Sequence, residues 1–235
     1  MKKHNIIIQC RFSSSRLPGK AMYPLRGIPI LAFLIRRLKH GLSEEHFRLI
    51  LATSSLPQDD PAAAWAKYEG IHCIRGDHDN VLARYIQTIE TFPSPVNVRV
   101  TADNPLTCPE ITKQCVDLAV KEGFEYTSTD GFPYGTGVDI FTDDLLYRIS
   151  DMGSTPEDLE HINNVVLNNP DQFNTGRLDA CPPLAKKHLR MTVDTPEDFK
   201  LMDQVLSSCR IKPIWIVPLA DAIQLFETFN KKVIN

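Results

Sequence analysis

Long apolar runs are missing from this 235-residue chain, and none approaches the roughly 20 residues that a membrane-spanning helix needs. The apolar part of the opening stretch "MKKHNIII" is also too short for a signal peptide. No low-complexity segment or internal repeat of solenoid length is visible. We therefore expect a compact, soluble protein with no membrane partner.

Paired cysteine spacings are missing too. The six cysteines are scattered along the chain, and no two of them form a C-x-x-C pattern. We expect free thiols, as in proteins of the reducing cytoplasm, and hence a cytoplasmic location. The cysteines are Cys10, Cys73, Cys108, Cys115, Cys181 and Cys209.

A surplus of positive charge is the third feature that the sequence lacks. The chain has 26 Lys and Arg against 29 Asp and Glu, which gives a formal net charge of -3. Proteins that bind the phosphate backbone of nucleic acid usually concentrate Lys and Arg, so we do not expect a nucleic-acid partner. Any basic site must be local.

The chain does contain short β-branched or apolar runs that alternate with amphipathic helical stretches. This alternation is typical of a mostly parallel sheet covered by helices, the α/β class. Helices are expected from Ile30 to about Leu38, with Gly41 as a stop, and from about Asp79. A terminal helix is expected at "PLADAIQLFETF". The predicted strands are "NIIIQC", "FRLILATSS", "GIHCIRG", "VNVRVTADNP", "GVDIFT" and "HLRMTVD".

Three short patterns predict where further helices begin. In "TCPE", Thr107 can cap, Pro109 suits the first turn and Glu110 can complete a capping box. The pattern "TPED" occurs at Thr155 and again at Thr195, each time before an apolar-periodic segment. We expect a helix to begin at both.

No linker rich in Pro, Gly or Ser divides the chain. The simplest organisation is one domain over residues 1–235 with a small β-containing insertion within roughly 124–190. The stretch "DGFPYGTG" is expected to form a loop over the strand ends. In open α/β sheets, ligands bind beyond the carboxyl ends of the strands.

The stretch "QCRFSSSRLPGK" follows the first predicted strand and is the most basic turn of the chain. Arg11, Arg16 and Lys20 supply three cations, and Ser13, Ser14 and nearby backbone amides supply neutral donors. Such groups match the many acceptor oxygens of a polyphosphate. The spacing fits neither a Walker loop nor G-x-G-x-x-G, and a basic turn can also be an ordinary solvated surface.

Two acidic residues follow predicted strands and are candidate metal ligands. Asp103 in "RVTADNP" could hold Mg²⁺, a hard cation that accepts one or two carboxylates together with phosphate oxygens and water. Asp194 in "VDTPED" could be a second carboxylate for the same ion. The alternatives are an Asx turn before Pro105 for the first and a polar turn before a helix for the second.

Six motifs together resemble the cytidylyltransferases of the spore coat polysaccharide synthesis type, which are relatives of the CMP-Kdo and CMP-sialic acid synthetases. The resemblance covers almost the whole chain and implies the nucleotide-diphospho-sugar transferase fold, a Rossmann-like sheet with helices on both faces. The motifs occur in the family's order. They read "QCRFSSSRLPGK", "ATSSLPQDD", "IRGDHDNVLARY", "RVTADNPL", "LEHINN" and "RMTVDTPEDF".

The resemblance also implies how the nucleotide is bound. Arg11, Ser14, Arg16 and Lys20 would bind the phosphates of CTP, and the backbone of residues 9–13, with Ser13 among them, would lie near the base and ribose. Thr53 would lie near the base and ribose too. Arg75 and Asp77 would close the nucleotide pocket. Asp103 and Asp194 would bind Mg²⁺, and together with Arg16 and Lys20 they are the expected catalytic residues.

Acceptor recognition is assigned to five residues. Arg99 precedes Asp103 in its motif, and Asp139 falls where the family tends to carry an acid, although a half-exposed strand would show the same alternation. Glu160 and His161 would project toward the acceptor, although such a histidine is more often packed or on the surface. Arg190 alternates with Thr192 and Asp194, and a carboxylate on the acceptor would give it a partner.

The sequence departs from the family pattern at three positions. Ser13 replaces a glycine, so the backbone there has less conformational freedom to approach a base or phosphate. Cys10 stands where alanine is usual, and Leu159 replaces a common arginine before the Glu-His pair. The last change could alter acceptor recognition.

We therefore expect a Mg²⁺-dependent cytidylyltransferase that couples CMP to a sugar acid or sugar-like acceptor for surface polysaccharide synthesis. A nucleotidyltransferase using another nucleotide, a sugar 1-phosphate or a non-sugar acceptor is the alternative. A nucleotide-binding protein without catalysis is a further possibility, which the presence of both metal carboxylates disfavours. The resemblance also implies a homodimer.

Overall fold

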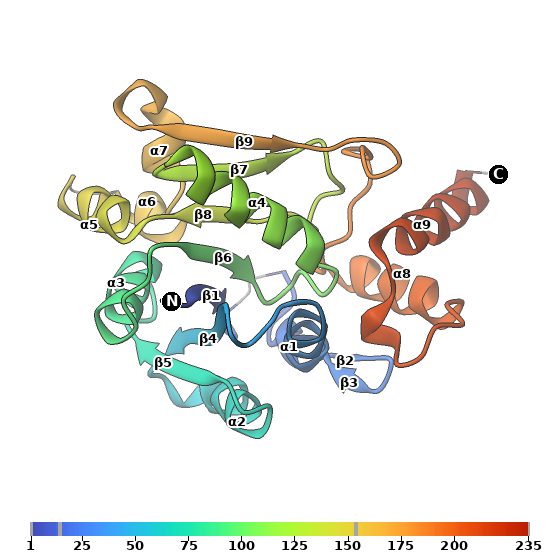
Figure 1. Cartoon of the computed structure of the whole chain (residues 1–235). Coiled ribbons are helices and arrows are strands. Elements are labelled where there is room, and N and C mark those ends of the chain that lie inside the picture. Colours follow the sequence, from blue (N-terminus) through green and yellow to red (C-terminus); the bar gives the residue numbers. More distant parts are fainter. Residues whose placement is uncertain (1, 14–15, 153–154, 235) are drawn as a thin grey trace.

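Seven strands form one sheet at the centre of the protein (Figure 1). The computed structural model describes residues 2–13, 16–152 and 155–234, with the backbone alone over 230–234. In the strand order β5–β4–β1–β6–β8–β7–β9, only β8 runs antiparallel to its neighbours. The strands are β1 (His4–Gln9), β4 (Phe47–Ser54), β5 (His72–Gly76), β6 (Asn97–Thr101), β7 (Tyr126–Asp130), β8 (Asp139–Phe141) and β9 (Thr175–Asp179).

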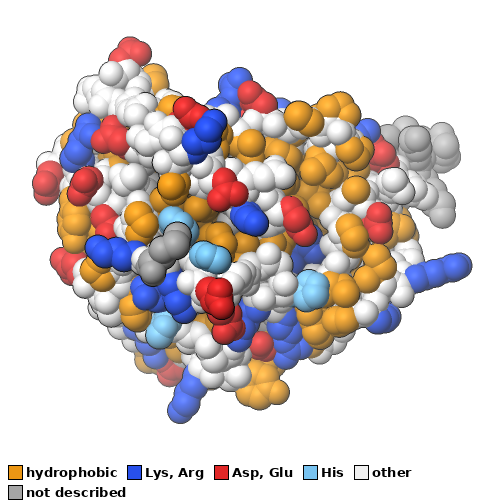
Figure 2. Space-filling view, viewed as in Figure 1, with side chains coloured by type: hydrophobic (Ala, Val, Ile, Leu, Met, Phe, Trp, Pro, Cys, Tyr) orange, Lys and Arg blue, Asp and Glu red, His pale blue; other side chains and the backbone are white. Residues whose placement is uncertain are grey.

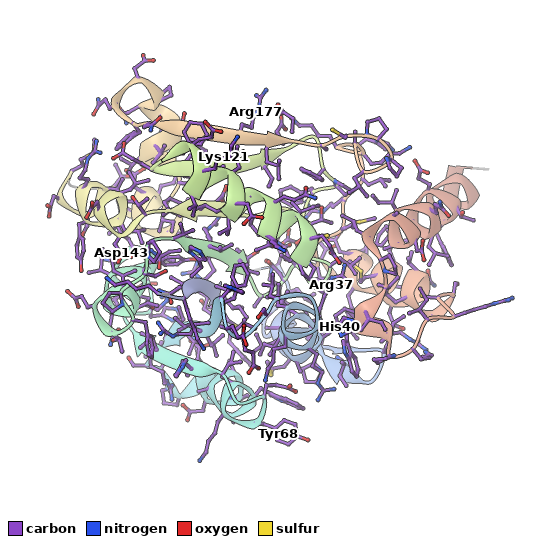
Figure 3. The ribbon with its side chains drawn as sticks, viewed as in Figure 1. Arg37, His40, Tyr68, Lys121, Asp143 and Arg177 are labelled. Carbon is purple, nitrogen blue, oxygen red and sulfur yellow. The ribbon has the colours of Figure 1, made fainter. Side chains whose placement is uncertain are left out.

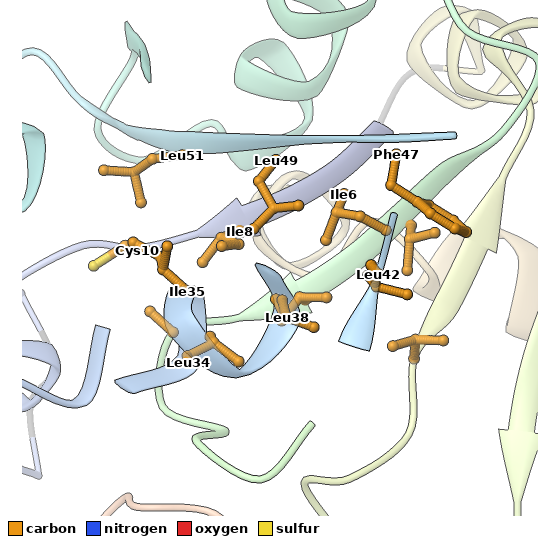
Figure 4. Packing of buried hydrophobic residues seen from close by; sticks show 14 of the residues in the cluster. Ile6, Ile8, Cys10, Leu34, Ile35, Leu38, Leu42, Phe47, Leu49 and Leu51 are labelled. Atoms are coloured by element: carbon orange, nitrogen blue, oxygen red, sulfur yellow. The ribbon is translucent and has the colours of Figure 1, made fainter. Parts of the chain in front are cut away.

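Helices cover both faces of this sheet, because its strands carry apolar side chains on both sides. Ile6 and Ile8 of β1 pack with α1 (Ile30–Gly41), α2 (Asp60–Tyr68) and α4 (Pro109–Glu122), as Figure 4 shows for α1. Ile7 points to the opposite face. That face is covered by α3 (Val81–Thr91), α5 (Asp143–Asp151) and α7 (Asn164–Asn168), with α6 (Pro156–Glu160) against α3.

A third apolar cluster joins the C-terminal segment to the start of the chain. It brings α8 (Pro196–Ser207) and α9 (Leu219–Ile234) against the small hairpin of β2 (Pro24–Leu25) and β3 (Ile28–Pro29). The buried guanidinium of Arg37 donates hydrogen bonds to the carbonyls of Thr107, Trp215 and Val217, and so fastens this segment to α1 (Figure 3). The short 3-10 helices are η1 (Lys20–Met22), η2 (Pro57–Asp59), η3 (Pro170–Gln172) and η4 (Ile214–Ile216).

The predicted fold class is confirmed, as are the strands in the first half and the helices that begin after Thr155 and Thr195. The strand predicted over "HLRMTVD" is wrong, because the only β pairing of this segment within the described residues is an isolated bridge from Arg190 to Tyr134. Its alternating side chains enter the C-terminal cluster instead of a sheet. The polar strands β7 and β9 were not predicted.

Thr107 does not cap α4 as predicted. Cys108 occupies the cap position, and the hydroxyl of Thr107 donates to the carbonyl of Asn104 instead. The range 124–190 supplies β7, β8 and β9 to the central sheet, while its proposed roles in acceptor binding and dimerisation stay predictions. None of the helices in the described ranges has the length and apolar character needed to cross a membrane.

Gly41 ends α1 where the helix meets Pro109, the first residue of α4. A Cβ at this position would lie 2.4 Å from Cβ and 2.6 Å from Cγ of Pro109.

We predict that Gly41→Ala lowers the free energy of unfolding by about 1–3 kcal/mol, because the rigid proline ring must shift. Urea denaturation measures this. His40→Ala, an exposed neighbour, should change it by less than about 0.5 kcal/mol; equal effects would show that the contact with Pro109 is not the cause.

Candidate active site

A cavity of about 360 Å³ opens at the carboxyl ends of β1 and β6. β1 pairs with β4 on one side and with β6 on the other, so the order in which the strands follow one another reverses between β1 and β6. This is the topological switch point at which open α/β sheets bind their ligands. The walls come from the loop after β1, the loop after β6, α3, Tyr134, the end of α6 and the segment before α8.

One lysine joins two carboxylates on the wall of this cavity. The ammonium group of Lys20 donates to Oδ2 of Asp103 at 2.5 Å and to Oδ1 of Asp194 at 2.6 Å. The three side chains are only 13%, 22% and 10% exposed, respectively. Burial by itself disfavours the charge of Lys20, yet the two carboxylates outweigh it and raise the pKa of the ammonium. The lysine is therefore charged at neutral pH.

Local backbone structure positions each member of this cluster. Gly19 has φ 68°, a left-handed conformation, and its N–H donates to the carbonyl of Phe12, so the basic loop folds back just before Lys20. The carbonyl of Asp103 accepts the N–H of Val193, which aligns the loop after β6 with the segment before α8. The N–H of Asp194 donates to Asp198, the third residue of α8.

Two arginines add positive charge beside Asp194. Arg16 lies 3.3 Å from its Oδ1 and is 63% exposed, while Arg190 pairs with Asp194 and, at 3.2 Å, with Asp198. Burial opposes ionisation of Asp194, but Lys20 and the arginines hold the pKa of this carboxyl below its usual range. The guanidinium of Arg190 lies 5.2 Å from the ring centre of Tyr134, which lines the cavity.

The structure also brings Arg11, Arg99, Glu160 and His161 to the cavity. Arg11 and Glu160 form an ion pair, so the basic loop touches the end of α6. Arg99 donates through Nε to Gln9 at 3.1 Å and through Nη1 to Asp139 at 2.8 Å. Burial disfavours the charge of Arg99, but Asp139 raises the pKa of the guanidinium.

Asp139 does not line the cavity within the described part of the chain. Its carboxylate accepts hydrogen bonds from Arg99 and, at 2.9 Å, from the hydroxyl of Tyr126. It therefore holds Arg99, which in turn holds Gln9. In this arrangement Asp139 acts through Arg99, and its assignment to the acceptor stays a prediction.

The remaining nucleotide-binding candidates differ in whether they line the cavity. Ser13 lines the cavity, whereas Ser14 lies outside the described residues. Arg75 binds the carbonyls of Ser54 and Leu56, and Thr53 is fully buried with no hydrogen-bond partner for its hydroxyl in the described structure. Their nucleotide roles, like that of Asp77, stay predictions.

Asp77 lies at the carboxyl end of β5, outside the wall of the cavity as described. Its carboxylate accepts the N–H groups of Asn80 and Asp79, and these bonds lower the pKa of the carboxyl. It thereby shapes the turn that leads into α3.

Sequence reasoning missed Asp59 and Arg84. Asp59 is fully buried and accepts hydrogen bonds from the hydroxyl of Ser54 and, at 2.8 Å, from the N–H of Phe12, so it anchors the basic loop. Its signal was its place among the acids of "ATSSLPQDD". Arg84 lies on the wall of the cavity, and an arginine between apolar residues of an amphipathic helix was its signal.

Cys10, one of the departures from the family pattern, is buried in the main core. Burial raises the pKa of its thiol, and the nearby carboxylates of Asp59 and Asp103 raise it further. The thiol is therefore neutral at physiological pH. A neutral buried thiol is a packing group and a poor nucleophile.

Asp103 and Asp194 are the carboxylates that fit a divalent cation. Both bind the ammonium group of Lys20, and Asp194 also pairs with Arg16 and Arg190. Oδ1 of Asn104 on the same wall is buried with no hydrogen-bond partner among the described residues. Mg²⁺ prefers hard oxygen donors and completes its shell with phosphate oxygens and water. Among the described residues, no group of three His, Cys, Asp or Glu is placed to hold a metal by itself.

Comparison with known proteins identifies the class. A family model described as Cytidylyltransferase matches residues 5–174. The chain belongs to the cytidylyltransferase family and is a nucleotidyltransferase. The family resemblance drawn from the six motifs is thereby confirmed.

Individual relatives agree with this class. The chain is 29% identical to the spore coat polysaccharide biosynthesis protein SpsF of Bacillus subtilis over 210 residues. This matched region covers 88% of each protein. A cytidylyltransferase structure from Leptospira borgpetersenii matches with a TM-score of 0.89 at 27% identity, over 98% of this chain and 96% of that one. A structure of CMP:2-keto-3-deoxy-manno-octonic acid synthetase complexed with CTP shares the fold, with a TM-score of 0.65 and 17% identity over 88% of this chain and 99% of that one.

Asp198 provides a test of the electrostatics around Asp194. Burial opposes its ionisation, but the N–H of Asp194 and the guanidinium of Arg190 hold the pKa of its carboxyl below the usual 3.8. A carboxyl whose pKa is lowered by folding stabilises the protein above its unfolded pKa, and the effect is lost as pH falls through the folded pKa. We predict that Asp198→Asn destabilises the protein at pH 7 and that the difference from wild type shrinks below about pH 4.

Urea denaturation of both proteins at pH 7, 4 and 3 measures this difference. If Asp198→Asn is equally destabilised at pH 7 and pH 3, the negative charge of Asp198 is not what stabilises the start of α8.

Proposed function

We propose that this nucleotidyltransferase transfers CMP from CTP to a sugar acid or another sugar-like acceptor, with release of pyrophosphate, for surface polysaccharide synthesis. The family supports CTP as the nucleotide. The printed name of the Bacillus subtilis relative supports polysaccharide synthesis, and the synthetase that shares the fold acts on a sugar acid.

The observation that carries the proposal is the contact of Lys20 with both Asp103 and Asp194 at the switch point of the sheet. Through this contact, the basic loop, whose cations suit phosphate groups, lies beside two carboxylates that suit a metal ion. A site for binding a nucleotide alone would need the cations but has little use for two buried acids beside them. Transfer of a nucleotidyl group needs both.

The residues of the cavity match the charges of the reaction. An oxygen of the acceptor attacks the α-phosphorus of CTP. The bond between the α-phosphorus and the oxygen that bridges the α and β phosphates breaks, and pyrophosphate leaves in line. Negative charge grows on the phosphoryl and leaving oxygens during this step. Arg16 and Lys20 lie where they can neutralise it, since both line the cavity beside Asp194.

Asp103 and Asp194 would hold Mg²⁺ in this reaction. Bound there, Mg²⁺ supplies Lewis-acid stabilisation of phosphate oxygens and can lower the pKa of an acceptor hydroxyl. The ammonium group of Lys20 must then share or leave the carboxylates that it binds in this structure. Phosphate oxygens provide the alternative partners for that ammonium group.

The acceptor is expected at the side of the cavity formed by β6 and the end of α6. Arg99 and His161 line this side. Arg99 is fixed by Asp139, and Gln9 accepts a hydrogen bond from Arg99, so a polar surface with defined donors is available. Hydroxyl and carboxylate oxygens of a sugar acid are suitable partners for such donors.

We also propose a cytoplasmic location, a homodimer and no nucleic-acid partner. All six cysteines are free, as in proteins of a reducing compartment. Acidic and basic side chains are interspersed on the face shown in Figure 2. Within 124–190, Tyr147, Met152 and Leu167 are 41%, 44% and 55% exposed, and a partner subunit would cover such apolar side chains.

The first test is pyrophosphate release from CTP, UTP, ATP and GTP with Mg²⁺, each against a panel of sugar acids, sugar phosphates, polyols and phosphonates. Release with CTP and one class of acceptor is the expected result and identifies the substrate. Release with another nucleotide would overturn the assignment of CTP. Tight binding of CTP without any release would leave the nucleotide site but contradict the acceptor class proposed here.

Variants of the two acids test the metal assignment. We predict that Asp103→Asn and Asp194→Asn each lower kcat for pyrophosphate release by at least about a hundredfold, because a catalytic metal contributes several kcal/mol to the transition state. Asp203→Asn is a matched control, since Asp203 pairs with Arg26 outside the cavity. Turnover unchanged in either test variant would rule out its residue as a necessary metal ligand.

A further inference from the structure

Arg84 is a buried cation for which no ion pair with a carboxylate is found among the described residues, although Asp59 and Asp77 lie near enough to act on its charge. Its side chain, 1% exposed, lies on the wall of the cavity. Nη1 donates to the carbonyls of Asp77 and His78 at 2.5 and 3.0 Å, but Nε has no hydrogen-bond partner in the described part of the chain. A buried charge that no carboxylate contacts directly is costly. An anionic ligand in the cavity would provide a direct contact.

Arg11 lies close to Arg84 and adds to the positive charge. Burial lowers the pKa of the Arg84 guanidinium and the charge of Arg11 lowers it further, while the carboxylates of Asp59 and Asp77 raise it without cancelling these effects. Within the described ranges, the only carboxylate paired with either arginine is that of Glu160, which binds Arg11. Two guanidinium groups therefore line this wall, and the one carboxylate paired there binds Arg11 alone.

Glu160 is poorly suited to be the permanent partner of these arginines. Its side chain is 45% exposed, whereas that of Arg11 is 25% exposed and that of Arg84 is almost fully buried. A half-exposed ion pair contributes little to stability, so a ligand can replace it at low cost. A phosphate group has more oxygens than a carboxylate and can bind two guanidinium groups at once.

We propose that Arg11 and Arg84 together bind one phosphate group of the nucleotide, and that Glu160 occupies this phosphate site while the nucleotide is absent. The inference rests on the proposed function insofar as it assigns the nucleotide to this cavity. It adds Arg84 as a nucleotide-binding residue. It also makes Glu160 a competitor of the nucleotide, in place of the acceptor contact expected from the sequence.

The two residues should change nucleotide affinity in opposite directions. Arg84→Met removes a charged donor and should weaken binding of CTP by at least about tenfold. Glu160→Gln removes the competing charge and should tighten binding by about two- to fivefold. Glu157→Gln is the matched control, because Glu157 is exposed on the same helix and its side chain makes no recorded contact with Arg11.

Isothermal titration calorimetry in buffer with EDTA tests this without any metal. The probes are CTP, inorganic tripolyphosphate and cytidine. We expect both effects with CTP and tripolyphosphate and neither with cytidine. Equal weakening by Arg84→Met for CTP and cytidine, with tripolyphosphate unchanged, would mean that Arg84 binds the nucleoside and would overturn the phosphate assignment.

The binding measurement on Glu160→Gln does not depend on how well the Arg84 variant folds. Arg84→Lys, which keeps the charge, and thermal unfolding of each variant show whether lost affinity reflects lost structure. If Glu160→Gln binds tripolyphosphate no more tightly than wild type, Glu160 is not a competitor and the proposal fails. If a folded Arg84→Met binds it as wild type does, Arg84 is not a phosphate ligand.

Tripolyphosphate carries no base and needs no acceptor, so failure of this inference differs from failure of the proposed function. Pyrophosphate release from CTP together with unchanged tripolyphosphate binding in both variants would overturn the inference alone. The expected changes in binding without any pyrophosphate release would overturn the proposed reaction and leave the phosphate site in place.

Discussion

The contact of one ammonium group with two carboxylates holds the candidate active site together. Lys20 reaches Asp103 and Asp194, which are 83 and 174 residues away along the chain. Because both carboxylates bind the same ammonium group, they lie close together and would repel each other without a cation between them. Lys20 therefore stabilises the approach of the loop after β6 to the segment before α8. Arg37, deeper in the protein, fastens the segment between α8 and α9 by donating to the carbonyls of Trp215 and Val217.

Much of the fold could be predicted, because β1, β4, β5 and β6 are apolar runs, buried or partly so, between helical patterns. The strands β7 and β9 carry mostly polar residues, so they have no comparable signal and depend on neighbours far away in sequence. The segment 188–194 shows the reverse problem. Its residues alternate as in a strand, but they are buried against helices, and a sequence pattern does not distinguish the two environments.

The candidate site shows the same division. The loop from Arg11 to Lys20, Asp103 and Asp194 could be brought together from sequence because each follows a predicted strand or precedes a helix. Arg84 could not, since its position in α3 suggests only an interrupted apolar face. Asp139 shows why an acid at the expected position is insufficient. Its charge is taken up by Arg99 and the hydroxyl of Tyr126, which depends on a cross-strand neighbour and on the conformation of each side chain.

Asp194 does not belong to the sheet, and it follows β9 in a segment that packs with the C-terminal helices. The part of the chain that matches the family model ends at residue 174, before Asp194 and Arg190. A gene fragment that ends near that point would still be recognised as a member of the family while lacking the second acid. Complete and truncated gene copies can therefore be told apart by the segment before α8. The presence of Asp194 in that segment should be checked before activity is assigned to a copy.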